Sequence, residues 1–296
     1  MTTPTAHRGI LVGVDGSPSA KVAVDWAARE AASRNVPLTL VHVINPVVFT
    51  NWTEVAMPVD YTVWQEERGA KILAAAAALA NDAAKEHGGV RVETETVSGS
   101  TLPTMIDLTK DAELVVVGCR GQGALARTLL GSVSSGLVNH AHCPVAVIHD
   151  EDPLMQDPRH APVVLGIDGS PASETATAIA FDAASRRGVE LVAIHAVSDS
   201  DVIEMPGVDY TTLEQQANEL LAERLAGWQE RYPDVRVRRV VTWSRPAKLL
   251  VEESEKAQLL VVGSHGRGGF TGMLLGSVSS AVAHAARMPV IVARRS

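Results

Sequence analysis

Two tandem α/β domains are predicted, each an open five-stranded parallel sheet, doubly wound with helices on both faces. The chain of 296 residues repeats itself, and short apolar runs alternate with alanine-rich helical segments in each copy. Aromatic residues make up only 4% of the chain, whereas Ala, Val and Leu are abundant. This composition is typical of parallel strands that are buried on both faces and covered by small-residue helices.

The internal repeat predicts the domain organisation. Four segments of the first half return in the second: Ile10–Pro18 as Val163–Pro171, Leu38–Val43 as Leu191–Ala196, Leu114–Gly118 as Leu259–Gly263, and Leu129–Ser135 as Leu274–Ser280. An acidic stretch with two prolines separates the copies, as in a linker. We therefore expect a first domain at residues 1–150, a linker at 151–161 and a second domain at 162–296.

Hydrophobic patterning predicts the elements within each copy. In the first copy we expect strands at 10–14, 38–43, 90–97, 114–117 and 145–148, and helices that include 18–32 and 66–86. Ser17 is the expected N-cap of the first helix, with Pro18 at its first position. The third strand alternates apolar with charged residues in both copies, which favours a place at the edge of the sheet.

Charge and composition exclude several classes of protein. The formal net charge is −8 and no long Lys/Arg run occurs, so a nucleic-acid partner is not expected. The longest apolar stretch, Ile72–Ala80, is far too short to span a bilayer. Residues 1–9 carry no signal-peptide pattern, and two cysteines are too few for a disulfide framework. We expect a cytoplasmic protein without a membrane association.

A glycine loop after the fourth strand is the strongest functional signal. The pattern Gly-x2-Gly-x9-Gly-Ser occurs once in each copy. Glycines allow backbone N–H groups to approach a phosphate closely, and the serine opens a helix whose positive end favours an anion. The loop residues that we expect at a phosphate site are Gly118, Cys119, Arg120, Gly121, Gln122, Gly123, Ala124, Gly131, Ser132 and Val133, and in the second copy Gly263, Ser264, His265, Gly266, Arg267, Gly268, Gly269, Gly276, Ser277 and Val278.

The sequence lacks two other glycine motifs that bind nucleotides. No Gly-Lys-Ser/Thr follows, so the loop lacks the lysine of a Walker motif, and no Gly-x-Gly-x-x-Gly opens the first helix. The alternative interpretation is a glycine-rich turn without a ligand. Two copies at identical spacing favour binding.

Residues at the ends of the first two strands complete the candidate site. Gly13, Asp15 and Val43, with Gly166, Asp168 and Ala196 in the second copy, lie where ligands of such sheets bind. Asp15 and Asp168 are candidates for ribose hydroxyls or, through water, for Mg²⁺ carried by the phosphates. The alternative is that each carboxylate bonds its own turn. His42 and His195 occupy equivalent positions, where a packed, hydrogen-bonded histidine is the expected role rather than a catalytic one.

These motifs resemble the universal stress protein family in its tandem-domain form, over nearly the whole chain. The opening Gly-x-Asp-Gly-Ser-Pro, the Leu-Val-His-Val strand and Gly-x2-Gly-x9-Gly-Ser-Val-Ser carry the resemblance, which is close to the mycobacterial tandem proteins. The resemblance implies strand order 3-2-1-4-5, ATP or another adenine nucleotide in each module, pairing of modules through their last strands, and a role in stress or dormancy.

The sequence is compatible with three functions. The leading hypothesis is an ATP-binding regulator with little or no turnover, without catalytic residues, and forming a homodimer of tandem chains that contacts unidentified protein partners. The second is an enzyme similar to the adenylating ATP pyrophosphatases, whose Ser-Gly-Gly-x-Asp-Ser loop is only partly matched by Gly13–Ser17. The third is an interaction module that holds no nucleotide.

Overall fold

The computed structural model describes residues 8–46, 61–119, 130–149, 157–196, 210–243, 245–266 and 274–294. By its internal contacts the chain divides into two compact units, Met1–Asp150 and Glu151–Ser296. The expected linker, 151–161, lies partly outside the described residues.

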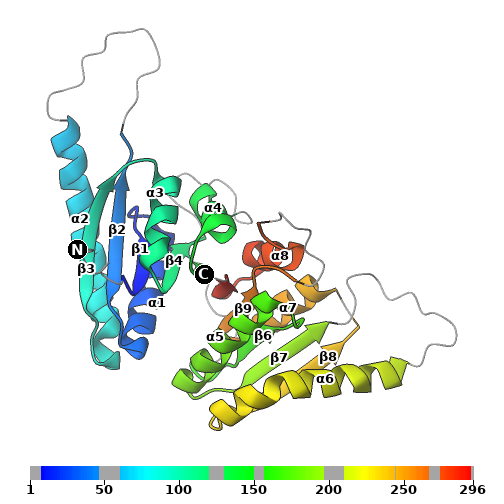
Figure 1. The fold of residues 1–296 in the computed structure, drawn as a ribbon. Helices are drawn as coiled ribbons and strands as arrows, with labels where there is room; N and C mark the ends of the chain where they lie inside the picture. Colours follow the sequence, from blue (N-terminus) through cyan, green and yellow to red (C-terminus); the bar gives the residue numbers. More distant parts are fainter. Residues whose placement is uncertain are drawn as a thin grey trace, which may run out of the picture. The chain divides into compact units, whose positions relative to one another are not determined.

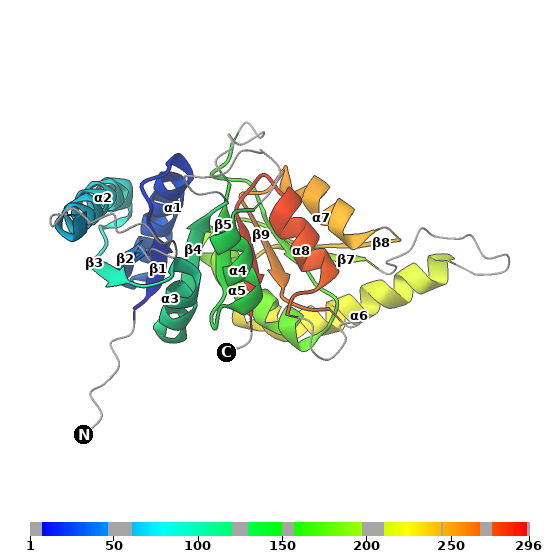
Figure 2. The same cartoon turned by 90° about the horizontal axis from the view of Figure 1, so that it is seen from above.

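The first unit is a parallel sheet in the order β3-β2-β1-β4-β5 (Figure 1). Its strands are β1 Ile10–Gly13, β2 Leu38–Ile44, β3 Val92–Ser98, β4 Leu114–Gly118 and β5 Val145–Ile148. Its helices are α1 Pro18–Arg34, α2 Tyr61–Ala84, α3 Thr101–Leu108 and α4 Ser132–His140, with short 3-10 helices at Lys85–His87 and Thr109–Asp111. Figure 2 shows α1 and α2 on one face of this sheet and α3 on the other, where α3 packs on α4.

The second unit repeats this arrangement in the order β8-β7-β6-β9-β10. Its strands are β6 Val163–Gly166, β7 Leu191–Ala196, β8 Val237–Thr242, β9 Leu259–Gly263 and β10 Val290–Ala293. Its helices are α5 Pro171–Arg187, α6 Tyr210–Arg231, α7 Pro246–Ser254 and α8 Ser277–Ala285. In Figure 2, α5 and α6 lie on one face and α7 and α8 on the other. The predicted α/β architecture is confirmed.

The central strands form the core of each unit. Ile10, Leu11 and Val12 of β1 are fully buried, which explains why the strand is apolar at successive positions. β3 and β8 lie at the sheet edges and are half-exposed along their length. Their place at the edge of each sheet is as predicted, whereas the residues of β8 do not alternate between covered and exposed positions.

Local chemistry determines where the helices begin and end. Ser17 caps α1, since its Oγ accepts a hydrogen bond from the Ala20 amide at 3.2 Å. The helix continues two residues beyond the expected Ala32 because Asn35 adopts a left-handed conformation and donates to the carbonyls of Ala31 and Ala32. The structure likewise starts α2 at Tyr61, five residues before the expected start at 66.

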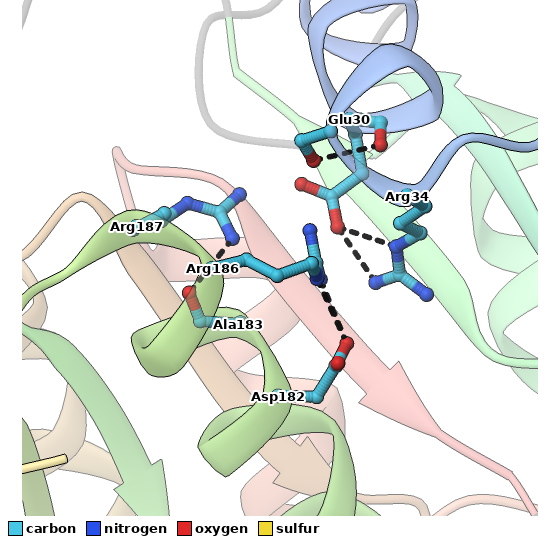
Figure 3. Close-up of polar contacts among 7 residues, drawn as sticks. Glu30, Arg34, Asp182, Ala183, Arg186 and Arg187 are labelled. Carbon is cyan, nitrogen blue, oxygen red and sulfur yellow. Dashed lines mark hydrogen bonds and ion pairs between the residues drawn. The ribbon is translucent and has the colours of Figure 1, made fainter. Parts of the chain in front are cut away.

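Ion pairs one helical turn apart support α1 and α5. In α1, Arg34 Nε donates to Glu30 Oε1 at 2.7 Å. In α5, Arg186 Nη2 donates to Asp182 Oδ2 at 2.9 Å (Figure 3). Exposed pairs of this kind contribute only about 0.3–0.5 kcal/mol each. Glu30 differs because it is buried, so Arg34 also serves to pair a buried carboxylate.

Among the described residues, no helix combines the length and the apolar character that crossing a membrane requires.

Candidate functional site

The site lies where the strand order changes direction in each unit. β1 pairs with β2 on one side and with β4 on the other, so Ile10 lies opposite both Leu38 and Leu114. β6 pairs with β7 and β9 in the same way. Loops that leave neighbouring strands in opposite directions open a crevice at the carboxyl ends, where α/β sheets bind ligands. The Asp turn after β1 or β6 and the glycine loop after β4 or β9 therefore start side by side, as predicted.

Each Asp turn uses one carboxylate oxygen for its own backbone. Asp15 Oδ1 accepts from the Ser17 amide at 2.9 Å, and Asp168 Oδ1 accepts from the Ser170 amide at 2.9 Å. The alternative role, in which each carboxylate bonds its own turn, is thus observed in both units.

In the second unit the Asp turn and the glycine loop meet. A Cβ at Gly266 would lie 2.7 Å from Asp168 Oδ2, so the carboxylate lies close against the glycine loop. The hydroxyl of Ser170 donates to the His265 carbonyl at 3.0 Å. The carboxylate of the Asp turn and the start of the glycine loop therefore lie in direct contact in this unit.

Several predicted loop residues lie outside the described residues. They are Arg120, Gly121, Gln122, Gly123 and Ala124 in the first unit, and Arg267, Gly268 and Gly269 in the second.

The two ends of each glycine loop are held together by hydrogen bonds. The Gly131 amide donates to the Cys119 carbonyl at 2.8 Å, and the Gly276 amide donates to the Ser264 carbonyl at 2.7 Å. Protein acceptors therefore already engage these two glycine amides. Cys119 and Ser264 are themselves buried.

In each unit a second serine of the motif fixes the helix after the glycine loop to the strand before it. This serine was not among the predicted site residues. Ser134 Oγ donates to the Gly118 carbonyl at 2.7 Å, and Ser279 Oγ makes the equivalent bond to Gly263. The signal was the second serine of Gly-Ser-Val-Ser, which recurs in both copies. This bond sets the position of the helix start relative to the end of the strand.

The helices α4 and α8 begin without a side-chain cap. Their N-caps are Gly131 and Gly276, and in the described part of the chain no side chain accepts from their first amides. By contrast, serines cap α1 and α5. The first amides of a helix have no intrahelical acceptor, and the macrodipole makes this end positive. Ser132 and Ser277, the first helical residues, are exposed, so these ends can accept an anion from solvent.

Two predicted glycines are also required for packing, and two more lie close against side chains. A Cβ at Gly118 would lie 2.7 Å from the carbonyl carbon of Ser19, and one at Gly263 would lie 2.8 Å from that of Ala172. Gly13 packs on Met105, and Gly166 packs on Leu250 and Val262. These contacts explain the glycines without a ligand, and contact with a nucleotide stays a prediction.

The histidines of β2 and β7 bond to backbone. His42 Nδ1 lies 2.7 Å from the Val14 carbonyl, and His195 Nδ1 lies 2.8 Å from that of Ile167. Because a carbonyl only accepts, Nδ1 carries the proton in both rings. Val43 and Ala196 follow these histidines and are half-buried.

Within the described ranges, no group of three or more His, Cys, Asp or Glu residues is placed to hold a metal ion. Any Mg²⁺ at Asp15 or Asp168 would therefore depend on ligand phosphates and water for its other ligands.

Comparison with known proteins identifies the family. The model of the universal stress protein family matches residues 7–149 and again residues 160–294. The chain belongs to the universal stress protein family. Universal stress protein Rv2005c of Mycobacterium tuberculosis is 58% identical over 296 residues, covering 100% of both chains. Universal stress protein Rv2623 of the same organism is 55% identical, covering 100% of this chain and 99% of its own.

A solved structure shows the same fold. The crystal structure of a universal stress protein from Archaeoglobus fulgidus has a TM-score of 0.71 at 20% sequence identity, covering 99% of this chain and 100% of that chain. The likeness supports the tandem architecture of this universal stress protein and indicates nothing about its ligand.

Proposed function

We propose that this universal stress protein binds one ATP-type adenine nucleotide in each unit and acts as a cytoplasmic regulator during stress or dormancy, with little or no turnover. The observation that carries the proposal is the start of α4 and of α8. In both units a helix start with a glycine N-cap, whose first amides have no side-chain acceptor among the described residues, is anchored to the strand beside the Asp turn.

Different residues would contact different parts of the nucleotide. The first amides of α4 and α8, at Ser132, Val133, Ser277 and Val278, would hold phosphate oxygens. Asp15 and Asp168 would accept from ribose hydroxyls or hold Mg²⁺ through water, and the backbone at Val43 and Ala196 would contact the base. The nucleotide supplies the negative charge that these helix ends otherwise lack.

Regulation rather than catalysis suits these groups. The sequence has no Walker lysine, and each strand-end histidine uses Nδ1 on a backbone carbonyl. Without the Walker lysine, bound nucleotide is expected to persist, and it can shift the protein between states that protein partners or a second chain recognise.

The test is an ATP titration of the double variant Ser132→Asp with Ser277→Asp, followed by calorimetry. An acidic residue in the first turn favours the helix dipole, so folding is retained. Its carboxylate repels phosphate at the same amides. We expect ATP affinity to fall by about a hundredfold or more at each site, which is at least about 2.8 kcal/mol.

A charge-matched control separates local from general repulsion. Ala78→Glu with Gln229→Glu adds the same two charges at exposed helix positions far along the chain from the glycine loops. This control should bind ATP as the unaltered chain does. Equal affinity of all three proteins, or no binding by the unaltered chain, would contradict the proposal.

A further inference from the structure

The Asp-Gly turn of the second unit is held by two contacts on one residue. The Gly169 amide donates to Ser173 Oγ at 3.0 Å. The Gly169 carbonyl accepts from Arg224 Nη1 at 3.2 Å, and the guanidinium occupies the space that a Cβ at Gly169 would need. Both backbone groups of this glycine are therefore engaged, and a side chain from α6 covers the turn.

Neither contact occurs among the described residues of the first unit. The equivalent glycine is Gly16, which has the same left-handed conformation, with φ 82° against 77° at Gly169. Ala20 stands where the second copy has Ser173. When Tyr61 and Tyr210, the first residues of α2 and α6, are aligned, Ala75 stands where the second copy has Arg224. In the described part of the first unit, no hydrogen bond reaches the Gly16 backbone, and Gly16 is exposed.

The guanidinium also has an unused donor. Arg224 Nε is buried and has no hydrogen-bond partner among the described residues. A positive group held in this way on the turn favours negative charge nearby, because burial weakens solvent screening. The turn itself presents Asp168 to Gly266 and the glycine loop.

We infer that the two nucleotide sites are unequal, and that Arg224 makes the second site the tighter one. The inference rests on the proposed function. A turn that is already ordered loses less conformational freedom on binding than one that the ligand must order. The second site should therefore fill first as the ATP concentration rises, so that partly and fully loaded chains are separate states. Arg224 acts here as a positioning residue.

The inference is tested on chains with one working site each. Ser277→Asp leaves the first site, and Ser132→Asp leaves the second. Calorimetric titration with ATP should give a dissociation constant about tenfold lower for the second site, comparable to one charge-assisted hydrogen bond. Adding Arg224→Leu to both chains should make the two dissociation constants equal. Arg224→Lys in its place keeps a charged donor and should restore part of the difference between the constants.

Matched measurements identify the cause. Arg231→Leu makes the same substitution seven residues further along α6 and should leave both constants unchanged. In the nucleotide-free chain, backbone amides at 167–171 should exchange more slowly than those at 14–18. Arg224→Leu should accelerate exchange at 167–171 and leave exchange at 14–18 unchanged.

The outcomes distinguish the inference from the proposed function. Failure of the unaltered chain to bind ATP would overturn both. Binding with equal constants at the two sites, or a difference that survives Arg224→Leu, would overturn the inference alone.

Discussion

Glycines at the ends of the strands serve two separate physical purposes in this protein. Gly16 and Gly169 adopt positive φ, which non-glycine residues rarely do. Gly118 and Gly263 have another role: their missing side chains let the ends of β4 and β9 approach the first turns of α1 and α5. A residue of the glycine motif is thus required by the fold, whatever the site binds.

Substitution of Gly118 should therefore destabilise the protein. In Gly118→Ala the new Cβ would meet the Ser19 backbone, which cannot rotate away, and overpacking of this kind costs about 1–3 kcal/mol. Chemical denaturation should show this loss in the free energy of unfolding.

Gly227→Ala is the control. Gly227 lies in α6 with no atom within 4 Å of its Cβ position, so alanine should stabilise the chain by up to about 1 kcal/mol through helix propensity. A Gly118→Ala protein as stable as the unaltered chain would show that β4 and α1 can separate without cost.

At the level of elements, the helices of each unit start in two different ways. α1 and α5 start with a serine cap whose hydroxyl accepts from the first turn. α4 and α8 start after a glycine that offers no side-chain acceptor. The first kind of start has a side-chain acceptor, whereas the second has none in the described part of the chain.

This contrast predicts different costs for two similar substitutions. Ser17→Ala removes the cap of α1 and should lower the free energy of unfolding by about 1 kcal/mol. Ser132→Ala changes an exposed first residue of α4 and should alter stability by less than about 0.5 kcal/mol. Thermal and urea unfolding of the two variants measure this, and comparable losses would mean that Ser132 caps α4 in solution.

At the level of the whole molecule, the repeat places one candidate site in each unit. The strand order, the capped Asp turn and the anchored helix start recur in both. The two sites differ mainly in the side chains that surround this shared frame, such as Arg224 against alanine.

Native mass spectrometry of the freshly purified chain should therefore find up to two adenine nucleotides per chain. Ser277→Asp should reduce this number to one, because only one helix start remains free of added charge. The same spectra report whether two chains associate. A single nucleotide per chain at saturating ATP, unaltered by Ser277→Asp, would contradict a site in the second unit.

Much of this architecture was predictable because it depends on local patterns. Apolar runs such as 114–117 are strands that must be buried, Ser17-Pro18 is a local helix start, and the repeat doubles each signal. Element ends were less accurate, since α1 ends through the backbone conformation of Asn35 and not through its hydrophobic pattern.

The sequence by itself determined the two α/β units, the succession of strands along the chain and the position of the glycine motif. Periodicity and turn chemistry determine these features, and both are properties of neighbouring residues. Only the tertiary structure decided what each glycine faces, that Ser134 and Ser279 anchor the helix starts, and that Arg224 covers Gly169. Those contacts join residues distant in the chain, and their geometry follows from how strands and helices pack rather than from local propensity.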